Sequence, residues 1–178
     1  MTNDSIRKKM RFPDFDYAAQ GCYFITIVTH QRLCLFGFIH EGNMILNEAG
    51  VMINNYYQSI EERFPKVTIM ESVVMPNHFH CMIFCNKDNT DDIPKIIDYF
   101  KSSTTDAYIH GVKEKGWRPF HQHLWQRTYW DDIIWNGRQF EFVKNYIALN
   151  PYRWQKDNIN VQHDIDVDHI LWKLKTLR

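Results

Sequence analysis

Two histidines separated by a single phenylalanine are the most distinctive chemical feature of the sequence. His78, Phe79 and His80 lie within a run of apolar residues that is typical of a β-strand. Side chains two positions apart on a strand share one face and lie about 6.6 Å apart along it, so both imidazoles can converge on one ion while Phe79 enters the core. Neutral imidazole is the commonest metal-ligating side chain. The competing interpretation is a pair of polar residues on an exposed strand face, and His121 and His123 repeat the spacing in a loop-like segment.

A tyrosine and an asparagine share one face of a helix that we predict over residues 138–150. Tyr146 and Asn150 are four positions apart, so they lie one above the other, about 6 Å apart along the helix axis. They border the apolar stripe that should pack on the core, where an amphipathic side chain would emerge at a cleft edge. The competing interpretation is a tyrosine at the rim of the core and an asparagine that ends the helix before Pro151.

Taken together, these groups predict chemistry on a phosphate. A phenol with a reference pKa of about 10 is a poor nucleophile at neutral pH unless its proton is removed and the electrophile is polarised. A divalent metal held by His78 and His80 would polarise a phosphate oxygen. Asn150 could join them as a third ligand. Mixed nitrogen and oxygen ligands with open positions suit Mg²⁺ or Mn²⁺, and ligand type alone leaves zinc open.

The elements that must position these groups follow from hydrophobic periodicity and turn signals. Strands are expected at 22–29, 67–75 and 78–84, a hairpin over 33–46, helices at 47–63 and 93–109 as well as 138–150, a loop at 111–119, and a strand or irregular segment at 125–135. Asn47 is a candidate N-cap. This order predicts an α+β sandwich in which an antiparallel sheet carries helices on one or both faces. A parallel doubly wound fold would need strands and helices in regular alternation.

The two motifs resemble those of a known family. The strand at 73–80 resembles the His-hydrophobic-His strand of the HUH single-tyrosine transposases, and residues 146–151 (YIALNP) resemble their catalytic helix. The block at 125–132 is similar to that of the REP-associated tyrosine transposase branch. The resemblance covers residues 20–153 in order and spacing. In one departure, relatives often carry a histidine and an arginine where this chain has Asp132 and Trp135, which leaves a DNA contact from this block in doubt.

The resemblance implies a fold, an activity and a partner. It implies a ferredoxin-like α+β sandwich, and we expect this domain to span residues 1–154 with a basic arm at 1–20. Residues 155–178 match no motif of the family, and we expect them to form a tail of unknown role that packs on the same domain. Tyr146 would attack a phosphate of single-stranded or hairpin DNA, forming a covalent 5′-phosphotyrosine and releasing a 3′-hydroxyl. His78 and His80 would hold Mg²⁺ or Mn²⁺, with Asn150 as the third ligand. Relatives act as monomers or homodimers.

Composition limits how such a partner could be bound. The chain has 178 residues, with 21 Lys plus Arg and 21 Asp plus Glu, and the zero net charge excludes a pervasively basic binder. Residues 1–11 and 95–127 are nevertheless locally basic, whereas 41–71 is acidic, so one basic face is possible. For residues 1–11, a solvated terminus is the competing interpretation. The candidate DNA-contacting residues are Arg7, Lys8, Lys9, Arg11, Lys101, Arg118 and Arg127.

The sequence also bears on location. Residues 1–20 contain no apolar run typical of a signal peptide, and no stretch reaches the roughly 18 apolar residues of a spanning helix, so we expect a cytoplasmic protein, bacterial by resemblance, with no membrane partner. The four cysteines have no CxxC spacing and are expected to be buried thiols.

Three functional hypotheses follow. The first is a transposase-like strand transferase that uses Tyr146. The second is a domesticated relative that binds structured single-stranded DNA without cutting it. The third is a small metallohydrolase that activates a metal-bound water and does not need Tyr146.

Overall fold

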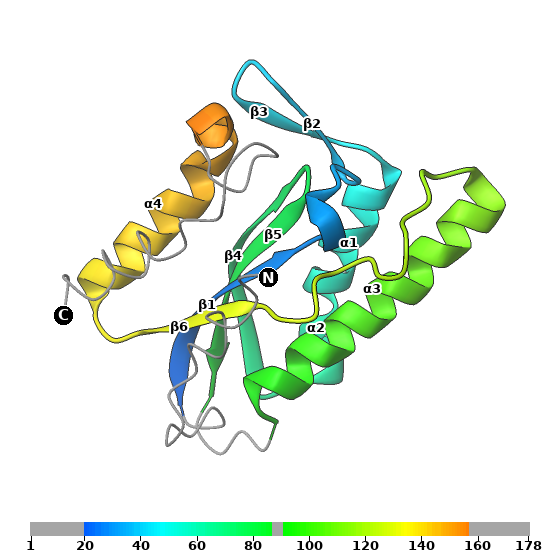
Figure 1. Cartoon of the computed structure of the whole chain (residues 1–178). Helices are drawn as coiled ribbons and strands as arrows, with labels where there is room; N and C mark the ends of the chain where they lie inside the picture. The colour runs from blue at the N-terminus through cyan, green and yellow to red at the C-terminus, as the bar shows by residue number, and fades with distance from the viewer. Residues whose placement is uncertain (1–19, 87–90, 157–178) are drawn as a thin grey trace, which may run out of the picture.

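The fold is built around one four-stranded antiparallel sheet. The protein structure is a computed structural model that describes residues 20–86 and 91–156 (Figure 1). The sheet has the order β4-β5-β1-β6, and every neighbouring pair in it is antiparallel. Its strands are β1 (Gly21–Val28), β4 (Val67–Met75), β5 (His78–Cys85) and β6 (Trp130–Ile134). A separate hairpin pairs β2 (Gly37–His40) with β3 (Asn43–Leu46).

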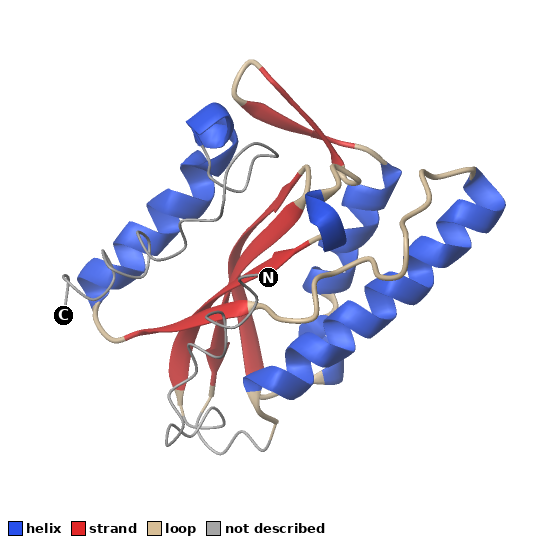
Figure 2. Cartoon of the chain, in the orientation of Figure 1, coloured by secondary structure: helices blue, strands red, loops and turns tan. Residues whose placement is uncertain are grey.

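Helices cover both faces of this sheet, as Figure 2 shows. One face carries α1 (Glu48–Gln58), α2 (Ile60–Arg63) and α3 (Ile93–Lys115), and the other carries α4 (Gly137–Arg153). Short 3-10 turns lie at His30–Arg32 and Trp154–Lys156. The chain order β1, α1, β4, β5, α3, β6, with β1 and β5 in the centre of the sheet, is that of a ferredoxin-like sandwich. The predicted α+β fold class is therefore confirmed.

Alternation along the central strands creates two separate apolar clusters. β1 contributes Tyr23, Ile25 and Ile27 to the larger cluster, which lies under α1 and α3. The same strand contributes Cys22 and Phe24 to a smaller cluster under α4. Because successive side chains of a strand point to opposite faces, each central strand serves both clusters.

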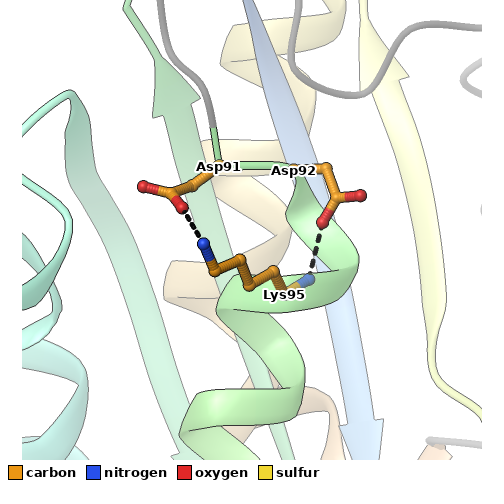
Figure 3. A network of polar contacts seen from close by, with 3 residues as sticks. All are labelled: Asp91, Asp92 and Lys95. Carbon is orange, nitrogen blue, oxygen red and sulfur yellow. Dashed lines mark hydrogen bonds and ion pairs between the residues drawn. The ribbon is translucent and has the colours of Figure 1, made fainter.

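Local capping explains where the helices begin. Asn47 accepts a hydrogen bond from the backbone N–H of Gly50 at 2.9 Å, so it is the N-cap that we expected from the sequence. Asp92 does the same for the backbone N–H of Lys95 at 2.8 Å, and Asp91 forms an ion pair with the Lys95 side chain (Figure 3). These contacts stabilise the N-terminus of α3, which begins at Ile93.

The helix predicted at 47–63 is divided at Ser59 into α1 and α2, and three other predicted boundaries were wrong. The helix predicted at 93–109 is α3. It continues to Lys115, through part of the loop predicted at 111–119, and ends at Gly116, whose φ is 68°. Gly111 lies inside this helix. A Cβ at this position would lie 2.2 Å from the Trp117 ring, so the glycine allows the ring to pack closely against the helix. The helix predicted at 138–150 is α4, and it likewise continues past Asn150 to Arg153, with Pro151 in its last turn. Because a proline has no backbone N–H, Pro151 cannot donate to the carbonyl of Ile147 in the preceding turn.

The third error concerns residues 33–36, which we expected in the hairpin. The backbone N–H groups of Leu35 and Phe36 instead donate to the carbonyl of Pro76, at 2.8 and 3.1 Å. This segment is therefore tied to the turn between β4 and β5, and β2 begins only at Gly37.

None of the helices in the described part of the chain has the length and apolar character needed to cross a membrane.

Candidate active site

His78 and His80 lie side by side on the face of the sheet that α4 covers. Both side chains are fully buried, and their ring centroids are 4.6 Å apart in an edge-on arrangement. Phe79, between them, points to the opposite face and stacks on Phe100 with ring centroids 5.2 Å apart. The shared face predicted from the strand period is therefore present, and the histidines are not exposed polar residues.

Each histidine is held through its Nδ1 atom by a neighbouring polar side chain. Nδ1 of His80 lies 2.7 Å from Oγ1 of Thr26, on the adjacent strand β1. Nδ1 of His78 lies 2.9 Å from Oδ1 of Asn77, in the turn before β5. Histidines that bind metals are usually anchored in this way through the nitrogen that does not bind the metal. The arrangement leaves Nε2 of both rings as the candidate ligand atoms.

Tyr146 is brought to this pair by the packing of α4. Val143 and Ile147, one turn apart on α4, are buried against the sheet, and Tyr146 lies half-buried beside them. Its hydroxyl lies 3.4 Å from Nε2 of His80. The edge-on contact of its ring with Phe24, at 5.9 Å between centroids, holds the phenol against the sheet.

Asn150 lies beside His78, as Tyr146 lies beside His80. It lies one helical turn after Tyr146 and is 1% exposed. Its Oδ1 atom is buried and makes no hydrogen bond of ordinary geometry. Its side chain is nevertheless close enough to His78 to affect the pKa of that imidazole. Asn150 is therefore a buried residue beside His78 and not an exposed helix stop, and its amide oxygen is a candidate ligand atom.

Burial keeps both imidazoles neutral. It lowers the pKa of His78 to about 3, an effect that the Asn150 side chain partly opposes. It also lowers the pKa of His80 well below its ordinary value, and the neighbouring His78 lowers it further. Neutral imidazoles have a free lone pair, which is the form that binds metals.

The donor set fits a divalent cation with open coordination positions. Across residues 20–86 and 91–156, no group of three or more His, Cys, Asp and Glu side chains is placed to hold a metal. Among the described residues, the buried amide oxygen of Asn150 is the candidate for a third protein ligand beside the histidine pair. Two imidazole nitrogens and one amide oxygen would leave room for phosphate oxygens and water.

The other predicted contact residues lie away from this site or outside the described residues. Nζ of Lys101 donates to the backbone carbonyls of Gln126 and Arg127, at 2.9 and 3.0 Å, so it ties α3 to the loop before β6. Arg118 and the Arg127 side chain are exposed. Arg7, Lys8, Lys9, Arg11 and residues 157–178 lie outside the described residues, so their predicted roles stay predictions.

The residues that depart from the family pattern differ from one another in exposure. Asp132 is buried, and its Oδ1 accepts a hydrogen bond from the backbone N–H of Ile133 at 2.8 Å. Trp135 is 52% exposed. The second His-x-His pair, His121 and His123, is exposed in the loop before β6.

Sequence reasoning missed Thr26 and Asn77. Thr26 is the cross-strand neighbour of His80, a relation that depends on the register between β1 and β5. Asn77 directly precedes His78 in the Pro-Asn turn, and this adjacency was the one signal that could have identified it.

The chain is similar to known transposases. A family model described as "Transposase IS200 like" matches residues 38–150, a range that includes both histidines, Tyr146 and Asn150. An uncharacterized protein of Haemophilus influenzae is 31% identical over 175 residues, which cover 87% of this chain and 93% of that protein. A second protein of Haemophilus influenzae, provisionally named a REP-associated tyrosine transposase, is 24% identical over 143 residues, covering 78% and 74% of the two chains.

A solved structure has the same fold. It is the REP-associated tyrosine transposase bound to a REP hairpin, which matches with a TM-score of 0.60 and 21% identity over 82% of this chain and 74% of that one.

Proposed function

Because this chain belongs to the IS200-like transposase family, we propose that it cleaves and rejoins single-stranded or hairpin DNA through a covalent bond between Tyr146 and a 5′-phosphate. The observation that carries the proposal is the 3.4 Å distance between the Tyr146 hydroxyl and Nε2 of His80. It supports a nucleophile located where a phosphate could be bound and polarised. The similar fold of a transposase bound to a REP hairpin supports hairpin DNA as the substrate class.

His78, His80 and Asn150 would hold Mg²⁺ or Mn²⁺ in this proposal. Such an ion, when bound, supplies Lewis-acid polarisation of a phosphate oxygen. Burial keeps both histidines in the neutral form required for this role. The helix that carries Asn150 also carries Tyr146, so one rigid element would set the nucleophile and one ligand together.

In the proposed cleavage step, one phosphorus–oxygen bond forms and another breaks. The Tyr146 hydroxyl loses its proton, and its oxygen bonds to phosphorus. The bond between phosphorus and the 3′-oxygen of the preceding nucleotide breaks, and that oxygen takes a proton to leave as a 3′-hydroxyl. Rejoining reverses these changes with a 3′-hydroxyl of another strand.

Both halves of the site come from one chain. Tyr146 on α4 approaches His80 of its own β5, with no second copy needed to bring them together. This arrangement supports a monomer as the cleaving unit, and a homodimer would then serve to bring two DNA ends together.

The direct test is formation of an SDS-stable protein–DNA adduct. The protein is incubated with a hairpin-containing single-stranded oligonucleotide and Mn²⁺, and we expect an adduct that Tyr146→Phe or EDTA abolishes. Tyr152→Phe is the matched control, because Tyr152 lies on the same helix, is 78% exposed and should not affect the adduct. An adduct that survives Tyr146→Phe or EDTA would contradict the proposal. Tight hairpin binding without any adduct would instead identify a non-cleaving binder.

A further inference from the structure

Asn77 is a fully buried side chain at the point where β4 turns into β5. It directly precedes His78, and no step of the proposed reaction uses it. Its amide is hydrogen-bonded to a backbone carbonyl and to the His78 imidazole. These two contacts favour one proton position on His78.

The first hydrogen bond orients the amide. Nδ2 of Asn77 donates to the backbone carbonyl of Arg32 at 3.2 Å. A carbonyl oxygen only accepts hydrogen bonds, so the nitrogen of the amide must face Arg32. The amide oxygen must then face His78.

The second hydrogen bond sets the tautomer. Oδ1 of Asn77 lies 2.9 Å from Nδ1 of His78, and an amide oxygen also only accepts. Nδ1 must therefore carry the proton. In a neutral imidazole this leaves Nε2 unprotonated, which is the form in which a ring nitrogen can bind an ion.

The loop after β1 keeps Asn77 in this position. The backbone N–H of Thr29 donates to the carbonyl of Asn77 at 2.9 Å, and the Thr29 hydroxyl shares its proton between this carbonyl, at 3.0 Å, and that of Leu33, at 2.9 Å. Gln31 and Arg32, in the same loop, have φ values of 56° and 55°. This left-handed conformation is uncommon for residues other than glycine, and here it occurs in the segment that presents the Arg32 carbonyl to Asn77.

His80 lacks an equivalent constraint. Its Nδ1 lies 2.7 Å from the hydroxyl of Thr26, and a hydroxyl can either donate or accept. The Thr26 contact holds the ring but does not determine which nitrogen is protonated. The neighbouring side chain therefore favours one tautomer at His78 but not at His80.

We propose that Asn77 is a positioning residue that holds His78 in the Nδ1-protonated tautomer, with Nε2 presented to a divalent cation. The role of the cation rests on the proposed function, whereas the tautomer can be measured without any metal. The two can therefore fail separately.

The first test is made on the metal-free wild-type protein. Two-dimensional ¹H–¹⁵N spectra of histidine-labelled protein at neutral pH report which ring nitrogen is protonated, and the His78 signals are assigned by their loss in His78→Gln. We expect His78 to be protonated at Nδ1, which is the minor tautomer of free histidine in water. Protonation mainly at Nε2 would overturn the proposal, whether or not the protein binds metal.

The second test compares two variants with and without an acceptor at this position. Asn77→Leu removes the acceptor, and we expect His78 to shift toward the Nε2-protonated form and Mn²⁺ affinity, measured by electron paramagnetic resonance of free Mn²⁺, to fall about 10- to 100-fold. Asn77→Asp keeps an acceptor and should retain the tautomer and bind Mn²⁺ more tightly than Asn77→Leu. A folded Asn77→Leu with unchanged tautomer and affinity, or an Asn77→Asp no better than it, would overturn the proposal. If Asn77→Leu does not fold, the wild-type tautomer and Asn77→Asp decide.

Discussion

The two faces of the central sheet differ in what they bury. The face under α1 and α3 buries apolar side chains almost without interruption, and from β5 it receives Phe79, Cys81, Ile83 and Cys85. The face under α4 has a much smaller apolar cluster, beside which lie the polar side chains of Thr26, His78, His80 and Asn150. The same strands supply both faces.

In this small domain, one face of the sheet therefore provides most of the folding stability and the other carries the candidate catalytic groups. Alternate residues of one strand perform the two tasks, so His78 and His80 are positioned by the neighbours that hold the sheet together. Burial of neutral imidazoles weakens their hold on protons and favours metal binding, but it contributes less to folding than an equal area of apolar contact. Variants on the two faces should therefore affect different measurements.

The largest expected effect on stability comes from the apolar face. Phe79 is 1% exposed and contacts the rings of Tyr57 and Phe100, each at 5.2 Å between centroids. Phe79→Ala should lower the free energy of unfolding by about 3–5 kcal/mol, because it removes buried area and leaves a cavity. Urea denaturation measures this loss. A loss below about 1 kcal/mol would contradict the claim that this face provides most of the folding stability.

The next effect belongs to the polar face and requires metal. Mn²⁺ at 100 times its dissociation constant should raise the free energy of unfolding by about 2.7 kcal/mol, because it binds only the folded chain. Thermal denaturation with and without Mn²⁺ should show this gain in the wild type and not in His80→Ala. His121→Ala is the control, since it alters the exposed His-x-His pair. A gain that persists in His80→Ala would place the metal elsewhere.

A polar group on the apolar face should have an intermediate effect. The buried hydroxyl of Tyr57 donates to the carbonyl of Met82 at 2.6 Å and accepts from the backbone N–H of Met70 at 3.2 Å, where the pairing of β4 and β5 is irregular. Tyr57→Phe leaves these groups unsatisfied and should cost about 1–3 kcal/mol. The adduct should still form at a temperature where the variant is folded. An unchanged midpoint in urea would contradict this role.

The smallest effect is expected at the start of α4. Asn136 caps this helix by accepting a hydrogen bond from the backbone N–H of Gln139 at 3.0 Å. Asn136→Ala should cost about 1 kcal/mol, whereas Asn136→Asp should keep the cap and most of the stability. Equal stability of the two variants would show that the cap does not matter.

Strand periodicity was sufficient to predict the central elements. The alternation in β1 and β5 predicted strands, and the i and i+2 spacing predicted one face for His78 and His80, because both depend only on neighbours in sequence. The cap at Asn47 was likewise a local signal.

The place of Tyr146 beside the histidine pair was predicted by combining the two motifs, but its packing contacts were not. The 3.4 Å approach to His80 depends on how α4 lies on the sheet, and the Thr26 contact depends on strand register. The loop predicted at 111–119 began too early, because the sequence does not show the Trp117 ring that packs against Gly111 inside the helix. Asn150 was predicted at a helix end, whereas the helix continues one turn and buries it.

The most direct test of the account is to locate the covalent bond to DNA. The adduct formed with a hairpin oligonucleotide and Mn²⁺ is digested with protease and nuclease, and the peptide that carries the residual nucleotide is sequenced by mass spectrometry. We predict a 5′-phosphate linked to the side-chain oxygen of Tyr146. A phosphate on any other residue, or hairpin cleavage that leaves no phosphorylated peptide, would contradict the assignment of Tyr146 as the nucleophile.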